Sequence, residues 1–317
     1  MNQIGSRVSQ RDPLVSVVIP SKNRPDLVIA TLVSVIDQTY DNIEIIVVDD
    51  GSDMPLAPLL KDRFSDRVLC LRNDQSLGGA VARNRGAQSA HGDYVAFLDD
   101  DDLWLPNKLE MQVDAFSKHG VDIGVVYCGF DFLYKEEIVP RQNKYHNDCD
   151  LSIAVLSGCP FGSPTPLIRK HYFDMVGGFD RELPSCQDWD LWIRLSKVCG
   201  FYPVKESLAL YRIHGDQIST NLRKKIDGRK MVLVKHYDEI KNYPRVLSAH
   251  YSRIGSLCVL ADEHVEARDF FSKALASNMF DGGSFVHLVL QFLCRPLEKW
   301  LIERVSVNTI DGIKVIH

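Results

Sequence analysis

The chain has 317 residues, 45% of them hydrophobic and 25% charged, a composition that predicts a globular protein with more than one domain. Its 37 basic and 42 acidic residues give a net charge of −5. This charge argues against a nucleic-acid partner, because proteins that bind nucleic acids usually have a basic face. The eight cysteines form no CxxC pair and no cysteine–histidine metal spacing. We therefore expect them to be reduced thiols in a cytosolic protein.

The N-terminal tail, residues 1–12, is polar and lacks the apolar segment of a signal peptide. No stretch approaches the roughly 18 apolar residues that a membrane span needs. We therefore expect a cytoplasmic protein, soluble or peripheral at the cytoplasmic face of the inner membrane.

Predicted strands and helices alternate along the first part of the chain, and each strand runs into polar residues. This order predicts an α/β fold with a largely parallel sheet of nucleotide-binding type. Neither GxGxxG nor GxxxxGK[ST] is present, so the dinucleotide and P-loop fingerprints do not apply. The expected strands are Val15–Ile19, Ile43–Val48, Arg67–Leu71, Tyr94–Leu98 and Val121–Tyr127, and the expected helices include Pro25–Gln38 and Leu105–His119.

Four consecutive aspartates, Asp99 to Asp102, follow the apolar strand Tyr94–Leu98 directly. The carboxyl end of a strand is where open α/β sheets bind ligands. Carboxylates packed so closely repel one another, and a hard divalent cation relieves that repulsion. The pattern favours a metal–phosphate site over a solvated acidic loop, and the pair Gly78-Gly79 at a helix start would let backbone approach a phosphate.

Four blocks follow one another along the first part of the chain: Val15–Arg24, Ile46–Ser52, Ala82–Gly86 and Phe97–Asp102. Together they resemble the family-2 glycosyltransferases, which are inverting enzymes of the GT-A fold. The resemblance covers about Pro13 to Thr220 and implies a nucleotide-diphospho-sugar transferase fold, a mostly parallel central sheet flanked by helices. We expect residues 13–220 to form this catalytic domain and residues 221–317 a helical extension.

The resemblance implies a donor site for a nucleoside-diphosphate sugar, first of all a UDP-sugar. Asp50 would hydrogen-bond the nucleobase. Asp99 and Asp101 match the ends of the DxD motif, so Asp99 would face the ribose or sugar and Asp101 would bind Mn²⁺ or Mg²⁺ at the diphosphate. Such a cation stabilises the charge of the leaving diphosphate. Arg83 is a candidate second cation, with a helix-surface arginine as the alternative. Further expected donor-site residues are Pro20, Asn23, Arg24, Ser52, Gly79 and Asp100.

The block Leu183–Leu195 aligns with the family's Glu-Asp motif, whose aspartate is the catalytic base. Here the pair reads Gln187-Asp188, so the first position departs from the common form while the base, Asp188, is kept. An inverting transfer needs one carboxylate to take the proton of the acceptor hydroxyl. Asp190 is the candidate for a structural aspartate, and Trp189 either stacks on a sugar or belongs to the core.

The segment Tyr211–Ser219 resembles an Arg-x-His segment that folds over the donor diphosphate. On this basis His214 is a candidate metal or phosphate ligand, with a structural histidine as the alternative. Arg212 would neutralise phosphate.

In the C-terminal extension, several residues fall at the spacings of one tetratricopeptide-like repeat. We expect a helical hairpin that packs on the catalytic domain or docks a partner. The apolar helix Phe285–Leu293 either packs in the core or docks on a membrane surface or a second subunit. Lys299 and Arg304 add positive charge after it. The repeat positions are Tyr251, Ile254, Gly255, Ala267, Phe271 and Ala274, and the helix carries a polar stripe at His287, Gln291 and Arg295.

The function expected from these patterns is metal-dependent inverting sugar transfer to a glycan or lipid-linked acceptor, in surface-polysaccharide or lipopolysaccharide biosynthesis. One alternative is a catalytically inactive nucleotide-binding or scaffold protein of a glycan assembly complex. Another is a sugar-phosphate nucleotidyltransferase, which would need a glycine-rich loop where this chain has Pro20–Arg24. A glycosidase would also use two carboxylates but has no need of nucleotide-type strands.

Overall fold

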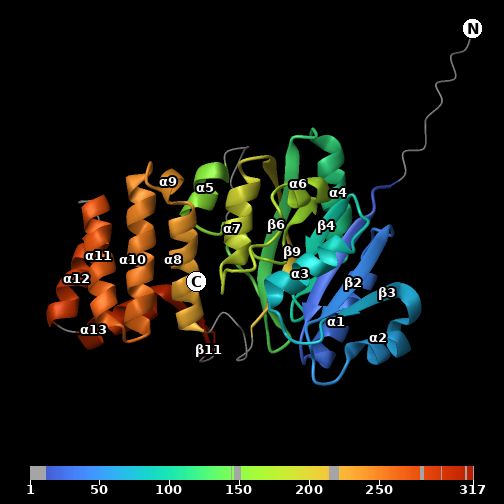
Figure 1. Ribbon diagram of the computed structural model, residues 1–317, viewed down its shortest axis with the longest axis horizontal. Helices are drawn as coiled ribbons and strands as arrows, with labels where there is room; N and C mark the ends of the chain where they lie inside the picture. Colours follow the sequence, from blue (N-terminus) through green and yellow to red (C-terminus); the bar gives the residue numbers. More distant parts are fainter. Residues whose placement is uncertain are drawn as a thin grey trace, which may run out of the picture.

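A central sheet organises the first part of the chain in the computed structural model, which describes residues 12–143, 145, 151–213, 221–278, 282–293, 295–310 and 313–316 (Figure 1). The strands are β1 (Val15–Ser21), β2 (Ile43–Asp49), β3 (Val68–Arg72), β4 (Tyr94–Phe97), β5 (Leu103–Trp104), β6 (Ile123–Tyr134), β7 (Glu137–Val139), β8 (Leu167–Arg169) and β9 (Gly200–Arg212). Their order within the described part is β3-β2-β1-β4-β8-β6-β9-β5, with β7 paired to β6.

The half of the sheet formed by β3, β2, β1 and β4 is parallel, as the sequence predicts. Val17 of β1, for example, pairs with Ile45 of β2 and Ala96 of β4. Alternate side chains point to opposite faces, so these apolar strands bury a core on each side. Helices α1 (Pro25–Ile36), α2 (Leu56–Phe64) and α4 (Lys108–Lys118) cover one face, and α3 (Gly79–Gln88), α6 (Lys170–Met175) and α7 (Gln187–Leu195) cover the other.

The other half of the sheet is mixed and was predicted less well. Strand β8 is antiparallel to β4 and β6, whereas β9 is parallel to β6 and antiparallel to β5. The predicted α/β fold is confirmed, but β5, β7 and β9 were not predicted. Two expected boundaries are also corrected, since β1 continues through Pro20 to Ser21 and the helix after the aspartates begins at Lys108.

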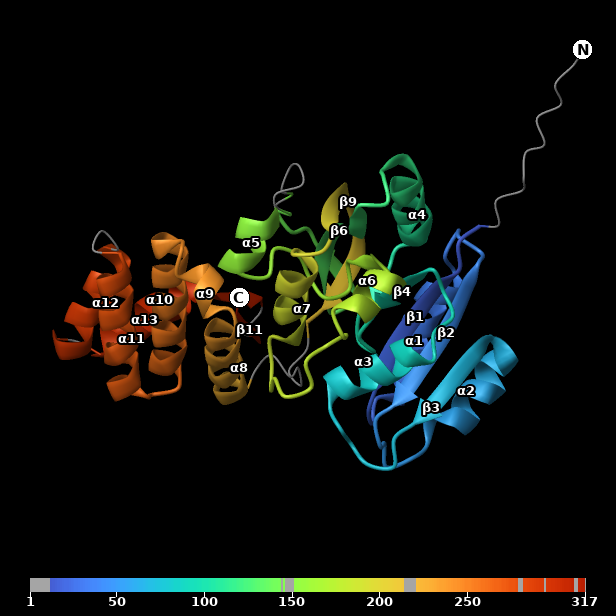
Figure 2. The same cartoon turned by 45° about the horizontal axis from the view of Figure 1, so that its top comes forward.

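Helices follow the sheet and lie against the side where α5 (Leu151–Ser157) and α7 are found (Figure 2). They are α8 (Leu222–Lys235), α9 (Tyr237–Ile240), α10 (Pro244–Leu260), α11 (His264–Ser277), α12 (Gly282–Leu293) and α13 (Arg295–Ser306). Helices α10 and α11 pack against each other, and Gly255 allows their close contact because a Cβ there would lie 2.9 Å from the Phe271 ring. The antiparallel pair β10 (Val307–Ile310) and β11 (Ile313–Ile316) was not predicted.

The helical region shares one continuous core with the sheet. Trp189 of α7 belongs to the same buried cluster as Ile226 of α8 and Phe271 of α11. His250 of α10 stacks on Trp189 with ring centroids 5.0 Å apart and hydrogen-bonds the Leu156 carbonyl of α5 at 2.6 Å. The hairpin is therefore packed on the sheet region, as one of the two expectations had it.

Helix α12 contacts the hairpin through His287, whose ring stacks on Phe271. Its Phe285 and Val286 are 59% and 50% exposed, so this helix keeps an apolar surface in the described chain. No described helix combines the length and apolar character needed to cross a membrane. Contact of this region with a membrane or a second subunit stays a prediction.

Candidate active site

The aspartate run lies at the carboxyl end of β4, where the sequence places it. Asp100 and Asp102 are buried, at 5% and 1% exposure. Burial, together with the charge of the Asp101 carboxylate, raises the pKa of Asp100 to about 6, although the 2.7 Å hydrogen bond from Ser21 acts in the opposite direction. Burial and the neighbouring aspartates also raise the pKa of Asp102 well above its usual range. Asp102 accepts a hydrogen bond from the Arg212 backbone at 3.0 Å, but its Oδ2 has no partner in the described structure. The site therefore carries excess negative charge.

Two arginines balance part of this charge. Arg24 donates to Asp100 at 3.1 Å and to Asp101 at 2.9 Å. Arg83 pairs with Asp99, and its side chain is only 15% exposed. The alternative of a helix-surface arginine is therefore wrong for Arg83. The oxygen donors of Asp99 and Asp101 fit a hard divalent cation, which prefers such ligands.

Gly79 permits this position of Arg83. The Arg83 side chain folds back over the start of α3, where a Cβ on residue 79 would lie 2.8 Å from Arg83 Nη1. The predicted donor-site residues Gly79, Arg83 and Asp99 are thus brought together by one side chain.

Asp50 holds a loop of the chain rather than facing open space. Its carboxylate accepts hydrogen bonds from Asn73 Nδ2 at 2.7 Å, Ser76 Oγ at 2.8 Å, and the backbone N–H groups of Leu77 and Gly78, both at 2.9 Å. Four donors match the acceptor capacity of a carboxylate. Burial disfavours the charge, but these bonds outweigh it and lower the pKa of Asp50. Asn73 and Ser76 were not predicted, and the direct nucleobase contact of Asp50 stays a prediction.

The expected donor residues Asn23 and Ser52 tie the ends of β1 and β2 together. The Asn23 backbone donates to Ser52 Oγ at 2.9 Å, and its side chain exchanges hydrogen bonds with Asp53. Asn23 has a φ of 55°, a left-handed conformation that asparagine tolerates better than most residues. Pro20 pairs with Val48 in the neighbouring strand. These residues therefore form one rim at the carboxyl edge of the sheet.

Asp188 sits in the first turn of α7, where the preceding chain bends sharply. Cys186, the residue before the helix, has a φ of 59°, which is uncommon outside glycine. Asp188 Oδ1 accepts from the Trp189 N–H at 2.8 Å, and Asp188 Oδ2 lies 3.6 Å from the Cys159 thiol. Arg83 interacts electrostatically with both Asp99 and Asp188. The predicted base and the aspartate run are therefore at the same end of the sheet.

Trp189 and Asp190 both have structural partners. Trp189 is 2% exposed, and its indole N–H donates to the Val155 carbonyl at 2.6 Å. Of its two expected roles, packing in the core is therefore the one that the structure supports. Asp190 is fully buried, and burial opposes its charge, but His236, Lys235 and Arg194 hold its pKa well below the usual range. The structural role of Asp190 is confirmed.

Arg212 contacts the backbone of the aspartate run. Its side chain donates a 3.1 Å hydrogen bond to the backbone carbonyl of Asp101 and forms an ion pair with Glu136. The other candidate of this segment, His214, lies outside the described residues.

The comparisons with known proteins agree with one another. The model of glycosyl transferase family 2 matches residues 16–171. The Escherichia coli protein "UDP-Glc:alpha-D-GlcNAc-diphosphoundecaprenol beta-1,3-glucosyltransferase WfgD" is 32% identical over 236 residues, covering 70% of this chain and 86% of that protein. An uncharacterized glycosyltransferase of Haemophilus influenzae is 30% identical over 245 residues, covering 73% and 80%. The chain belongs to glycosyl transferase family 2. It is an inverting glycosyltransferase.

Solved structures show that this glycosyltransferase has the GT-A fold. Residues 1–349 of S. aureus TarS, in complex with UDP-GlcNAc, match with a TM-score of 0.67 at 16% identity and cover 96% of each chain. The mannosyltransferase PcManGT from Pyrobaculum calidifontis, in complex with GDP-Man and Mn²⁺, matches with a TM-score of 0.58 at 16% identity, covering 92% and 85%. The predicted GT-A fold is confirmed.

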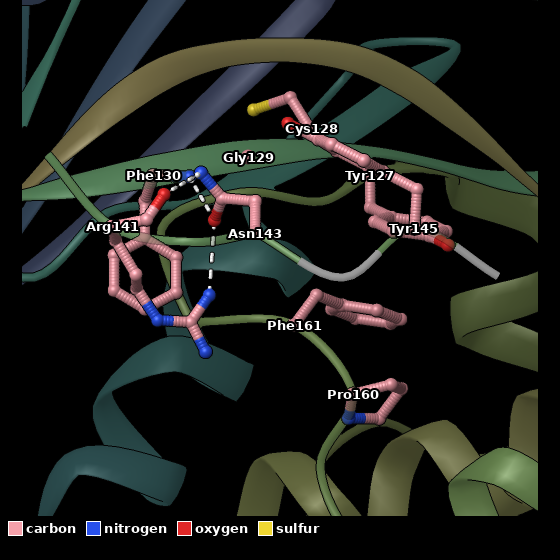
Figure 3. A pocket seen from close by; sticks show the side chains of 9 residues that line it. All are labelled: Tyr127, Cys128, Gly129, Phe130, Arg141, Asn143, Tyr145, Pro160 and Phe161. Atoms are coloured by element: carbon pink, nitrogen blue, oxygen red, sulfur yellow. Dashed lines mark hydrogen bonds between the residues drawn. The ribbon is translucent and has the colours of Figure 1, made fainter.

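A small pocket of the glycosyltransferase is lined by residues of β6 and of the segments around Arg141 and Phe161 (Figure 3). The rings of Tyr127 and Phe161 stack with centroids 4.5 Å apart. The Arg141 guanidinium lies 4.3 Å from the centre of the Phe130 ring and donates to Asn143 at 2.9 Å. The lining residue Pro160 directly follows Cys159, whose thiol contacts Asp188.

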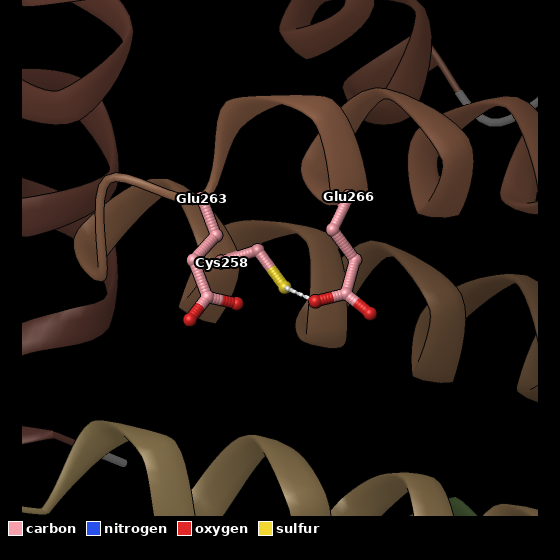
Figure 4. Close-up of side chains that lie close together, drawn as sticks. All are labelled: Cys258, Glu263 and Glu266. Atoms are coloured by element: carbon pink, nitrogen blue, oxygen red, sulfur yellow. Dashed lines mark hydrogen bonds between the residues drawn. The ribbon is translucent and has the colours of Figure 1, made fainter.

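A second group of potential metal ligands joins α10 to α11 (Figure 4). Cys258 Sγ lies 3.8 Å from Glu266, and Glu263 is close by. Both carboxylates already have cationic partners, since Glu263 pairs with Arg223 and Glu266 pairs with Lys230. We interpret this group as a structural link between α8 and the hairpin.

Proposed function

We propose that this glycosyltransferase moves a sugar from a UDP-sugar to a hydroxyl of a lipid-linked saccharide diphosphate, in surface-polysaccharide or lipopolysaccharide assembly. The observation that carries the proposal is the position of Arg83. Its guanidinium pairs with Asp99 of the aspartate run and interacts with Asp188. A donor phosphate site and a base are needed next to each other for direct transfer.

In this proposal Asp99 and Asp101 would hold a divalent cation, Mn²⁺ or Mg²⁺, with the donor diphosphate. When bound there, such a cation would stabilise the charge that develops on the departing diphosphate. Arg24 and Arg83, which now bond the aspartates, become available to phosphate oxygens, and arginine suits such oxygens because it donates two parallel hydrogen bonds.

Asp188 takes the proton of the acceptor hydroxyl in the proposed reaction. The acceptor oxygen forms a bond to the anomeric carbon as the bond from that carbon to the diphosphate oxygen breaks. The bonding electrons leave with UDP, and the anomeric configuration is inverted. The Cys159 thiol, 3.6 Å from Asp188 Oδ2, helps to hold the carboxylate in place.

The relatives support the choice of substrates. WfgD and a second Escherichia coli protein, WfaP, are both named as transferases from UDP-Glc to alpha-D-GlcNAc-diphosphoundecaprenol. WfaP is 29% identical over 248 residues and is covered over 94% of its length. The matching TarS structure contains UDP-GlcNAc, and the matching mannosyltransferase contains Mn²⁺ with its nucleotide sugar.

Calorimetric binding of UDP, GDP, dTDP and CDP, each with and without Mn²⁺, tests the donor half of the proposal. We expect UDP to bind more tightly with Mn²⁺, and Asp101→Ala to lose that enhancement. Asp114→Ala is the matched control, because Asp114 is exposed and pairs with Lys118 on the same helix. If no nucleotide binds under any condition, the aspartate run is not a working donor site and the scaffold hypothesis replaces this one.

A further inference from the structure

Lys108, the first residue of α4, is completely buried. A lysine is almost never fully buried unless it is paired with an acidic group. In the part of the chain that the structure describes, its ammonium group donates a 2.7 Å hydrogen bond to Gln112 Oε1, and Lys108 Nζ lies 4.0 Å from the centre of the Trp104 ring. Neither of these partners carries a charge. A buried cation with such partners costs stability, and this cost asks for another reason for its presence.

The groups around Lys108 leave it protonated at neutral pH. Burial lowers the pKa of Lys108 to about 8, although the Cys128 thiol of β6 acts in the opposite direction. Burial also raises the pKa of Cys128 to about 11, so this thiol offers no negative charge at pH 7. On the neighbouring strand β9, Glu206 acts electrostatically on the same thiol. Lys108 is therefore a cation held between an amide oxygen and an aromatic ring.

Both partners of Lys108 hold the same stretch of backbone. Trp104 donates its indole N–H to the Pro164 carbonyl at 2.8 Å, and Gln112 Nε2 donates to the Thr165 carbonyl at 2.8 Å. Because an ammonium group can only donate, it fixes the Gln112 amide with the oxygen toward Lys108 and the NH₂ group toward this carbonyl. One cation thus orients the donors to two consecutive carbonyls.

The stretch of residues 159–165 runs from this anchor to the proposed base. Thr165 closes a turn, since its backbone N–H and its hydroxyl both donate to the Gly162 carbonyl, at 3.1 Å and 2.8 Å. At the other end, the Cys159 thiol lies 3.6 Å from Asp188 Oδ2. One end of the stretch is therefore the anchored turn, and the other end contacts the base.

Trp104 also belongs to the main chain that follows the aspartate run. It is the second residue after Asp102, whose carbonyl accepts a hydrogen bond from Thr31 Oγ1 of α1 at 2.9 Å. The Trp104 backbone N–H donates to Ser34 Oγ of α1 at 3.2 Å, and Trp104 pairs with Ala209 of β9. The indole ring thus links a fixed part of the donor side to the stretch that leads to the base.

We propose that Lys108 is a positioning residue that holds the aspartate run and the stretch 159–165 in register, an inference that rests on the proposed function. It acts through Trp104 and Gln112 and contacts no substrate. Transfer requires that the donor phosphates and the base keep a fixed separation, and a displacement of about 1 Å can cost about 100-fold in rate. A buried charge that costs stability is then kept because activity needs it.

Kinetics of two variants test this link, with UDP-Glc and a short-chain alkyl α-GlcNAc diphosphate as substrates. Lys108→Met removes the charge and keeps a long unbranched side chain. Trp104→Phe keeps an aromatic ring beside the ammonium group and removes the N–H that binds Pro164. We expect each variant to lower kcat about tenfold or more and to change the affinity for UDP less than about twofold. The double variant should be no slower than the slower single variant, because both changes break one link.

Lys118→Met is the matched control, since Lys118 lies on the same helix, is exposed and pairs with Asp114. It should keep the kcat of the wild type. Losses that multiply in the double variant would overturn the link, and so would a loss of UDP affinity equal to the loss of kcat. Trp104→Phe decides the matter if Lys108→Met does not fold, because it retains the charge, and a normal kcat of this variant refutes the inference.

Hydrogen exchange of the free protein separates this inference from the choice of substrates. Backbone amides of residues 159–165 should exchange about tenfold faster in Trp104→Phe than in the wild type, because the loss of one anchor loosens the stretch. Those of α11 should be unchanged. Equal exchange of residues 159–165 in the two proteins contradicts the inference, whichever sugar is transferred. A wild type that binds no UDP, or that transfers no sugar to the probe, contradicts the proposed function itself.

Discussion

Ser185 Oγ donates a 2.8 Å hydrogen bond to the carbonyl oxygen of Lys224, and so ties the segment before Asp188 to helix α8. Gly228 lies one turn further along the same helix. A side chain there would collide with the Ser185 carbonyl, a backbone atom that cannot move without shifting the chain. The position of the base thus depends on a glycine forty residues away in sequence.

We expect Gly228→Ala to lower both stability and activity. Overpacking of this kind costs about 1–3 kcal/mol. Because the strain falls on the segment that carries Asp188, kcat should fall more than the affinity for UDP. Gly120→Ala serves as control, since a Cβ at Gly120 meets open space. Equal stability and kcat in the two variants would show that α8 does not position the base.

Asp188→Asn removes the proposed proton acceptor and keeps the shape of the side chain. We expect kcat to fall about 100- to 10,000-fold, the usual contribution of general base catalysis. UDP affinity and melting temperature should stay near the wild type, because the hydrogen bonds of the Asp188 carboxylate to described residues go to the neighbouring Trp189 N–H and the Cys159 thiol. Asp114→Asn is the control, and an Asp188→Asn variant with normal kcat would exclude this residue as the base.

Asp50→Asn tests whether Asp50 acts through the loop that it holds. An asparagine has one acceptor oxygen for the four donors that now bind the carboxylate. We expect a loss of about 1–3 kcal/mol in the free energy of unfolding, the cost of unsatisfied buried donors. UDP affinity should fall, because residues 76–78 lead into Gly79 and Arg83. Denaturant titration and calorimetry measure the two effects, and an unchanged stability would rule out the role as a loop anchor.

His250 predicts a pH dependence of stability. Burial, and the charges of Arg229 and Arg253, lower its pKa to about 4, while its hydrogen bond to Leu156 opposes them. The unfolded chain binds a proton near pH 6.5 and the folded chain only near pH 4. Stability is therefore lost as the pH falls through this window, by roughly 3 kcal/mol.

His250→Gln isolates this contribution because glutamine does not titrate and can still donate to the Leu156 carbonyl. The difference in unfolding free energy between the variant and the wild type should shift in favour of the variant between pH 6.5 and pH 4. A difference that is constant over this range would contradict the assignment.

The parallel half of the fold could be predicted because its strands are apolar runs that end in polar residues. Strand β9 could not be predicted in the same way. It contains Pro203, Lys205 and Glu206, and its pairing with β6 is interrupted by register shifts. Strand β5 has only two residues, too few for a pattern. These strands depend on tertiary pairing rather than on local sequence.

The proposed donor site could be located in the sequence where its residues form short motifs, as Asp99 and Asp101 do. Asn73, Ser76 and Cys159 were missed because each meets its partner only through the fold. Asn73 reaches Asp50 across neighbouring strands, and Cys159 reaches Asp188 from another loop.

The continuous core of α7, α8 and α10 has a consequence for how this protein can vary. Trp189, next to the base, packs on His250 and lies under Arg229. A helical region taken from another family member would bring a different surface to this tryptophan and to the turn that carries Asp188. To exchange acceptor preference between relatives, a chimera should therefore need to replace α7 together with α8 and α10.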